Sequence, residues 1–216
     1  MDYKQLIVDS GVRMYSAGLT VETWGNISYC DRETGRVYIT PSGMDYCKLT
    51  TDDIVVVDLQ GNVVEGNRRP SIETGLHVAV YNARPDVNAV IHTHPIFSTV
   101  FSSMGEDIPL MHDEGAQALG DVVRTAEYAL PGTPELAKNC VKALGQEAYA
   151  CLLQSHGAVC VSANMDGAFK VAKVLEMMAE IYYRIRATGG KYIPISDENI
   201  QTMKVFARTR YGQWEE

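Results

Sequence analysis

Several features are missing from this 216-residue sequence, and each absence excludes a class of protein. No apolar run reaches the ~18 residues of a membrane span, and the first twenty residues hold no apolar stretch typical of a signal peptide. Basic residues are scarce, since 19 Lys and Arg stand against 27 Asp and Glu and leave a net charge of −8. Such a chain repels phosphate backbones and anionic lipids, so neither nucleic acid nor a membrane is an expected partner. We expect a cytoplasmic protein.

The five cysteines do not occur in patterns that carry chemistry. They form no C-x-x-C pair, so neither a thiolate zinc cage nor a redox pair is indicated. Their odd number excludes a closed set of disulfides, and we expect reduced structural thiols. A chain of this length buries roughly 70% of the surface that its unfolded state exposes, so it needs no disulfide or structural metal for stability. A metal site, if one exists, is therefore chemical rather than structural.

Helical and strand periodicities are interspersed along the chain, which is typical of an α/β fold. Helical spacing with start and stop signals predicts helices over 3–17, 71–83, 95–104, 134–145 and 168–185, and a last helix from 196. Strand patterns predict hairpins over 27–40 and 54–64 and further strands over 87–93, 149–155 and 158–162. Hairpins are too frequent for a purely parallel sheet. We expect one domain, residues 1–216, with a mixed or antiparallel sheet covered by helices.

Two histidines at the end of an apolar strand indicate a metal site. His92 and His94 stand two residues apart, so on a strand both rings face the same side. His156 ends another apolar strand, and Gly157 after it allows a ligand or a second backbone to come close. Three imidazoles with bonds of ~2.0–2.1 Å and an open fourth position describe a catalytic zinc site. The sequence does not show that the two strand ends meet, and each histidine taken singly is better explained as an ordinary buried or surface residue.

Glu73 is the candidate general base. Ser71 can cap a helix, which puts Glu73 in the first turn, where a helix N-terminus stabilises a carboxylate. Capping and proton transfer beside a metal explain Glu73 equally well. His77 lies one turn later on the same face, and its apolar neighbours favour a place in the core.

Two glycine-containing turns, over 25–28 and 40–43, present backbone amides and hydroxyls that suit a phosphate group. Neither turn has the Gly-Lys-Ser/Thr ending of a P-loop, and turns of this kind are common. Taken singly, each is explained as a simple turn.

Six short motifs, none specific by itself, follow one another in an order that resembles a known family. They are Gly25-Asn26-x-Ser28, Thr40-x-Ser42-Gly43, Pro70-Ser71-x-Glu73, His92-x-His94-Pro95, Ser155-His156-Gly157 and Tyr211-Gly212. Together they span nearly the whole chain and resemble the class II sugar-phosphate aldolase and adducin-head family. The resemblance implies a three-layer α/β/α domain with a mixed, largely antiparallel sheet. It also implies a fourfold-symmetric homotetramer with active sites between neighbouring subunits.

The resemblance further implies roles for particular residues. Zinc would be held by His92, His94 and His156, with Glu73 as the base. Residues that match the family's phosphate-binding positions are Asn26, Ser28, Ser42, Gly43 and Ser71.

The implied activity is that of a metal-dependent lyase. It cleaves a ketose 1-phosphate, such as L-fuculose 1-phosphate or a related deoxy-ketose phosphate, to dihydroxyacetone phosphate and an aldehyde. A dication would stabilise the enediolate formed as the carbon–carbon bond breaks, while Glu73 moves the proton. The first alternative is a 4-epimerase, dehydratase or decarboxylase that uses the same enediolate. More distant alternatives are a hydrolase and a scaffold like adducin's head, although the presence of all three histidines argues against the scaffold.

Two positions depart from the family's pattern. Ile72 replaces a second serine and removes one phosphate contact, for which Arg68 or Arg69 is a candidate substitute if it is not simply solvated. The proton-donating tyrosine expected after the His-x-His helix is also absent. Asp113, acting across a subunit interface, and Tyr211 near the C-terminus are the remaining acid/base candidates.

Overall fold

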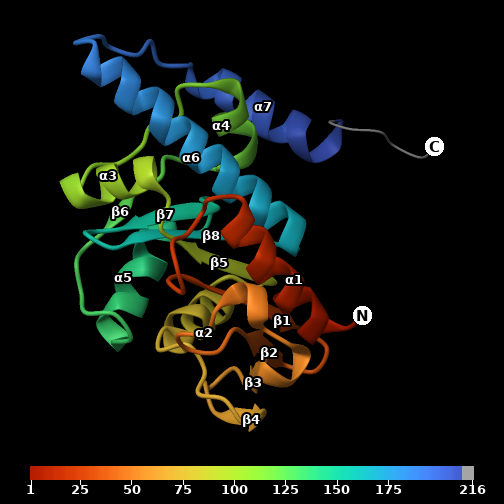
Figure 1. Ribbon diagram of the computed structural model, residues 1–216. Helices are drawn as coiled ribbons and strands as arrows, with labels where there is room; N and C mark the ends of the chain where they lie inside the picture. The colour runs from red at the N-terminus through yellow and green to blue at the C-terminus, as the bar shows by residue number, and fades with distance from the viewer. Residues whose placement is uncertain (211–216) are drawn as a thin grey trace.

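The computed structural model describes residues 1–210 and is built around one eight-stranded sheet (Figure 1). Its strands are β1 Asn26–Asp31, β2 Arg36–Ile39, β3 Val55–Val57, β4 Val63–Glu65, β5 Ala89–Thr93, β6 Thr125–Ala126, β7 Ala150–Leu153 and β8 Gly157–Ser162. Their spatial order is β4-β3-β2-β1-β5-β8-β7-β6. All neighbours pair antiparallel except β6 and β7, which are parallel. The predicted mixed, largely antiparallel sheet is confirmed.

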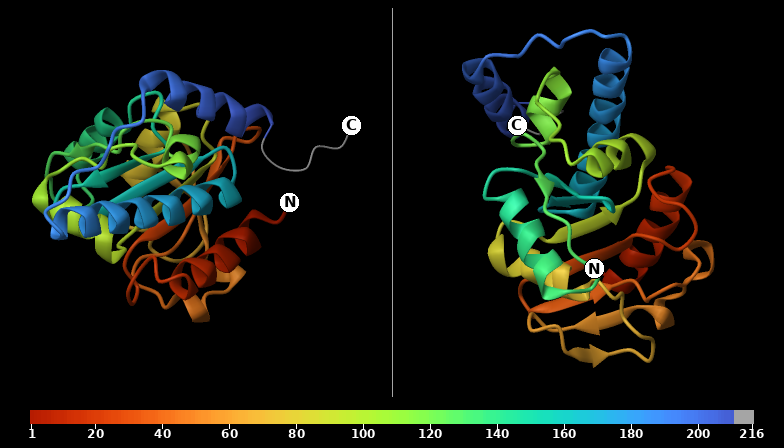
Figure 2. Two further views of the ribbon diagram at one scale, coloured as in Figure 1. Left: turned by 90° about the horizontal axis from the view of Figure 1, so that it is seen from above. Right: turned by 90° about the vertical axis from the view of Figure 1, so that its left-hand side faces the viewer.

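Helices cover both faces of this sheet, which confirms the three-layer α/β/α architecture (Figures 1 and 2). They are α1 Tyr3–Ser16, α2 Thr74–Ala83, α3 Ile96–Met104, α4 Asp113–Ala118, α5 Pro134–Leu144, α6 Met165–Ala187 and α7 Asp197–Thr209. Helices α2 and α5 pack together on one face, while α1, α3 and α6 cover the other. Helix α7 packs on α4, beyond α6. Within residues 1–210, no helix combines the length and apolarity needed to cross a bilayer.

Two apolar cores lie on the two faces of the sheet because side chains alternate along each strand. In β5, Ile91 belongs to the core under α1 and α6, whereas Val90 belongs to the core under α2 and α5. In β1, Ile27 and Cys30 divide in the same way. Alternation therefore places His92 on the face that α2 covers.

The start of α2 differs from its sequence-based prediction. The helix begins at Thr74, and Glu73 is its N-cap residue rather than a first-turn residue. Ser71 stabilises the preceding turn instead: its Oγ accepts a hydrogen bond from the Glu73 amide at 3.2 Å, and its carbonyl accepts one from the Thr74 hydroxyl at 2.7 Å. This turn sets Glu73 at the entrance of the helix.

A contact from α6 fixes the corner that follows β5. Pro95 precedes α3 and has no polar side chain with which to cap it. The Glu176 carboxylate of α6 accepts hydrogen bonds from the amides of Phe97 and Ser98, both at 2.8 Å, and from the Ser98 hydroxyl at 2.7 Å. A carboxylate here satisfies free amides and favours the helix dipole. Helix α6 thereby holds the segment that carries His94.

Candidate metal centre

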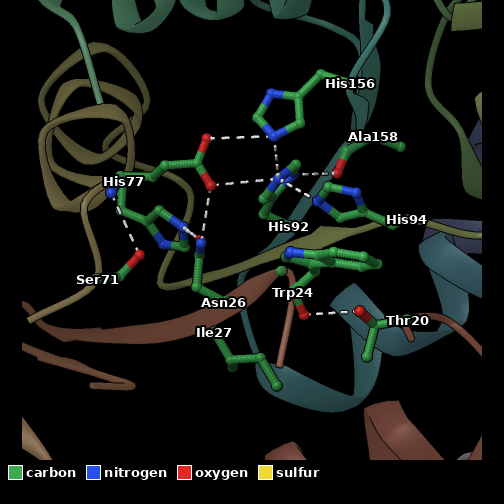
Figure 3. A network of polar contacts seen from close by, with 12 residues as sticks. Thr20, Trp24, Asn26, Ile27, Ser71, His77, His92, His94, His156 and Ala158 are labelled. Atoms are coloured by element: carbon green, nitrogen blue, oxygen red, sulfur yellow. Dashed lines mark hydrogen bonds and ion pairs between the residues drawn. The ribbon is translucent and has the colours of Figure 1, made fainter. Parts of the chain in front are cut away.

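Three histidine rings from two corners of the sheet meet at one point (Figure 3). His92 belongs to β5, His94 follows the end of that strand, and His156 lies in the turn between β7 and β8. The Nε2 atom of His92 lies 2.9 Å from that of His94 and 3.3 Å from that of His156. The structure therefore brings together the two strand ends whose meeting the sequence left open.

The approach of the two corners depends on Gly157. Strands β5 and β8 are paired neighbours, with Thr93 opposite Ala158, so the β7–β8 turn arrives beside the end of β5. A Cβ atom on Gly157 would lie 2.4 Å from the Thr93 carbonyl oxygen and 3.3 Å from the His92 ring. Contacts below 3.0 Å force a shift of the backbone, so a side chain here would push the turn away.

Gly157→Ala is therefore expected to weaken zinc affinity by at least about tenfold, through displacement of His156 from the other two rings. The measurement is competition for zinc against a chelator of known affinity, with circular dichroism to verify folding. Gly75→Ala in α2 is the matched control, because a Cβ there would meet nothing within 4 Å. Equal zinc affinity in both variants would contradict the role given to Gly157.

The three rings fit a divalent cation. Tetrahedral nitrogen ligands with bonds of ~2.0–2.1 Å lie ~3.3 Å apart, close to the separations found here. The Nδ1–H of His92 donates to the Ala158 carbonyl at 2.9 Å, so its Nε2 keeps a lone pair directed at the centre. Burial lowers the pKa of His94 to about 3 and that of His156 to about 4, which keeps both rings neutral and able to ligate.

Glu73 lies beside these rings with its two carboxylate oxygens in different surroundings. Its Oε2 lies 3.2 Å from His92 Nε2 and accepts a 2.8 Å hydrogen bond from Asn26 Nδ2. Its Oε1 lies 3.7 Å from His156 Nε2 and has no hydrogen-bond partner among the described residues, although it is buried. Burial opposes ionisation, but His92 and the hydrogen bond from the Asn26 amide are the main opposing influences, and the pKa of Glu73 is lowered. One oxygen is anchored, and the other is free to take a ligand or a proton.

A cavity of about 600 Å³ opens beside these groups. Four of the five residues predicted to bind phosphate line it, and they offer an amide, two hydroxyls and a glycine turn: Asn26, Ser42, Gly43 and Ser71. The cavity also has an apolar part, formed by Trp24, Ile72 and Pro131. His94, His156 and Glu73 face the same space, so polar anchoring groups and the histidine cluster share one cavity.

Ser28, the fifth residue predicted to bind phosphate, is not a lining residue of the cavity. Its side chain is fully buried, and its Oγ lies 2.6 Å from His77 Nδ1 and 2.6 Å from the Tyr81 hydroxyl. Ser28 lies two residues after Asn26 on the same face of β1, so it sits one step deeper beneath α2. Its hydroxyl is used inside the protein.

The remaining residues considered from the sequence, which are the acid/base candidates and the residues around the missing phosphate contact, lie at different places. Asp113 is exposed at the start of α4 and is not a lining residue of this cavity, while Tyr211 lies outside the described residues. Arg68, a candidate for the missing phosphate contact, is not a lining residue of the cavity, and its guanidinium pairs with Asp53 at 2.8 Å. Ile72 is 62% exposed at the cavity.

Sequence reasoning did not identify Trp24 as part of the site. Its side chain is 61% exposed and lines the cavity beside Asn26 and His94. The available signal was an aromatic residue directly before the Gly25 turn, which no periodicity rule would select.

Comparison with known proteins decides the family. The family model described as Class II Aldolase and Adducin N-terminal domain matches residues 5–183. The chain belongs to this family. Its class II aldolase relatives include the 5-deoxy-D-ribulose 1-phosphate aldolase of Bacillus thuringiensis serovar kurstaki, 38% identical over 210 residues and 97% of each chain. The L-ribulose-5-phosphate 4-epimerase of Salmonella paratyphi C is 34% identical over 204 residues and 90% of each chain.

A solved class II structure supports the same assignment. The structure titled L-fuculose 1-phosphate aldolase is 38% identical, covers 96% of each chain and superimposes with a TM-score of 0.91. The resemblance drawn from the six motifs is confirmed, as is the expected enzyme class, a lyase of the class II aldolase type. Class II aldolases are metal-dependent, and the relatives point to a sugar phosphate as substrate. Because both aldolases and an epimerase are similar to this chain, membership alone does not select the substrate.

Proposed function

We propose that this class II aldolase cleaves a ketose 1-phosphate, L-fuculose 1-phosphate or a related deoxy-ketose phosphate, to dihydroxyacetone phosphate and an aldehyde. The observation that carries the proposal is the position of Glu73, which is ionised, held through one oxygen and adjacent to the imidazoles of His92 and His156. These groups open into a cavity that is lined at one side by the Asn26 amide, the Ser42 and Ser71 hydroxyls and the Gly43 turn. Proton transfer, a cation site and an anchor for phosphate are the three parts that this reaction requires.

We assign the cation to His92, His94 and His156, with zinc as the first choice because three imidazoles and an open position suit it. Nitrogen sites also admit other divalent metals. When bound, the cation supplies Lewis-acid polarisation of the substrate carbonyl. The rings of His94 and His156 are neutral, and the Nδ1–H of His92 donates to the Ala158 carbonyl, so these rings are able to ligate a cation.

The protein's own groups divide the remaining work. The Asn26 amide, the Ser42 and Ser71 hydroxyls and the Gly43 turn bind the phosphate. Because Glu73 is ionised in the free protein, its Oε1 first takes up a proton from water. When the carbon–carbon bond breaks, the electron pair remains on the dihydroxyacetone phosphate carbon, which then takes that proton and leaves Glu73 ionised again. In the reverse direction Glu73 removes that proton.

A second acid/base must move the hydroxyl proton of the aldehyde half. We assign it to Asp113 of a neighbouring subunit in a homotetramer, or to Tyr211 near the C-terminus. The exposed position of Asp113, away from its own chain's cavity, supports a role in another subunit. The homotetramer stays a prediction, and sedimentation of the purified protein measures its assembly state. The single domain over residues 1–216 and the cytoplasmic location also stay predictions.

Proton exchange tests the proposal directly. The zinc-loaded protein is incubated with dihydroxyacetone phosphate in D₂O, and the hydroxymethyl protons are followed by ¹H NMR. We expect proton exchange that a chelator stops and added zinc restores. In a separate assay, we expect the same protein to cleave L-fuculose 1-phosphate or a 5-deoxy-ketose 1-phosphate. Absence of exchange despite bound zinc would overturn the proposal. Interconversion of pentulose 5-phosphates without release of dihydroxyacetone phosphate would favour the epimerase.

A further inference from the structure

His77, which the sequence places in the core, is fully buried but makes two polar contacts. We infer that His77, with Ser28 and Tyr81, positions the Asn26 amide and, through it, the Glu73 carboxylate. The inference rests on the proposed role of Glu73 and assigns no substrate contact to His77 itself.

The arrangement follows from the spacing of five residues on two elements. Glu73, His77 and Tyr81 are four residues apart, so they follow one face of α2 from its N-cap onward. Asn26 and Ser28 are two residues apart in β1 and lie on the face that α2 covers. Side chains of the two sets therefore alternate along the contact between α2 and β1.

Short contacts connect these residues into one chain. The Tyr81 hydroxyl lies 2.6 Å from Ser28 Oγ, which lies 2.6 Å from His77 Nδ1. On the other side of the ring, His77 Nε2 lies 2.5 Å from Asn26 Oδ1. Asn26 Nδ2 then donates to Glu73 Oε2 at 2.8 Å. Every step in this chain is a hydrogen bond between groups with no more than 6% exposure.

Geometry fixes the direction of each bond, starting from the Asn26 amide. The Asn26 Nδ2 atom donates to Glu73 Oε2, and the Asn26 oxygen faces His77, where an amide oxygen only accepts. His77 Nε2 must therefore carry the proton. Burial lowers the pKa of His77 to about 3, so the ring is neutral and its Nδ1 must accept from the Ser28 hydroxyl. Ser28 in turn accepts from Tyr81, so all donors point toward Glu73.

The far end of the chain is also anchored. Tyr81 is fully buried, and the backbone of Val90 forms a further hydrogen bond with its phenol. Val90 belongs to β5, two residues before His92. The strand that carries the histidines thus also holds the first donor of the chain that orients the base.

His77 determines the orientation of the Asn26 amide. With His77 in place, the Asn26 NH₂ group faces Glu73, and Asn26 lines the cavity in which it is the proposed donor to phosphate. Without the Nε2–H donor, the amide is free to rotate and present its oxygen to a carboxylate, which repels it. Both the position of Glu73 and the phosphate anchor would then be lost in part.

The first experiment compares His77→Leu with His77→Gln in the zinc-loaded protein. Leucine removes both polar contacts, whereas the glutamine amide can still donate near the position of Nε2. We expect His77→Leu to slow dihydroxyacetone phosphate exchange by about 10–100-fold at unchanged zinc content, and His77→Gln to recover much of that loss. Exchange by His77→Leu at the wild-type rate would overturn the inference.

Tyr81→Phe tests the far end, with Tyr29→Phe as its matched control. Loss of one hydrogen bond is expected to slow exchange by about fivefold in Tyr81→Phe. Tyr29 lies on the same strand as Ser28 but packs its ring on Tyr3, 5.1 Å away, and its variant should match wild type. Equal rates in the two variants would contradict the extended chain.

A second measurement needs neither substrate nor a variant. Nitrogen-15 NMR of labelled histidines distinguishes the two neutral tautomers, and we expect His77 in the Nε2–H form. An Nδ1–H tautomer would overturn the inference even if the enzyme is active. If wild type shows no exchange, the proposed function fails, and the tautomer still decides whether the hydrogen-bond chain exists.

Discussion

Glu73→Gln is expected to reduce both proton exchange at dihydroxyacetone phosphate and cleavage of the ketose phosphate by about 10³-fold. The amide has nearly the same shape and still offers an oxygen to Asn26, but it takes no proton at the pH of the reaction. The rates are measured by ¹H NMR in D₂O and by release of aldehyde. Because Glu73 is 4% exposed and contacts His92, His156 and Asn26, no solvent group replaces it readily.

The control for this variant is Glu180→Gln. It makes the same change on the surface of α6, where Glu180 pairs with Arg184 at 2.5 Å, and it should leave both rates unchanged. Zinc content is measured in all samples, so that loss of the ion is separated from loss of the base. A Glu73→Gln protein that binds zinc and keeps more than about a tenth of the wild-type rate would contradict the assignment.

His94→Ala is expected to abolish stoichiometric zinc binding and to lower cleavage by more than about 10³-fold, while the protein still folds. Removal of one imidazole leaves only two ring ligands for the cation. Folding persists because two apolar cores hold the sheet from both faces, and a catalytic ion adds little to them. Metal analysis measures the first effect, and circular dichroism with thermal unfolding measures the last.

His112→Ala controls for the loss of a histidine as such. Its ring is 49% exposed beside Glu114 at the start of α4, so this variant should bind zinc as wild type does. Unfolding of wild type on chelation would show that the ion is structural. Zinc binding by His94→Ala with wild-type affinity would show that the site lies elsewhere.

Local sequence patterns determined most of the elements. Strand β5 and strand β8 are apolar runs between turns, and α5 begins with its predicted Thr133 cap and Pro134. These signals act over a few residues, so they can be read without knowledge of the fold. Short α4 and β6 escaped prediction because six and two residues carry almost no periodicity. Strand β6 exists because it pairs with β7.

The sequence also supplied the ligand types, namely three imidazoles at strand ends and a carboxylate near a helix start. Only the tertiary structure decided that they meet, since His156 is 64 residues from His92 along the chain. That meeting needs the β5–β8 pairing and the bare backbone of Gly157. Tertiary packing likewise placed Ser28 against His77 inside the protein, a contact that the sequence did not indicate. Strand periodicity specifies which face a side chain takes, but what covers that face depends on contacts between distant segments.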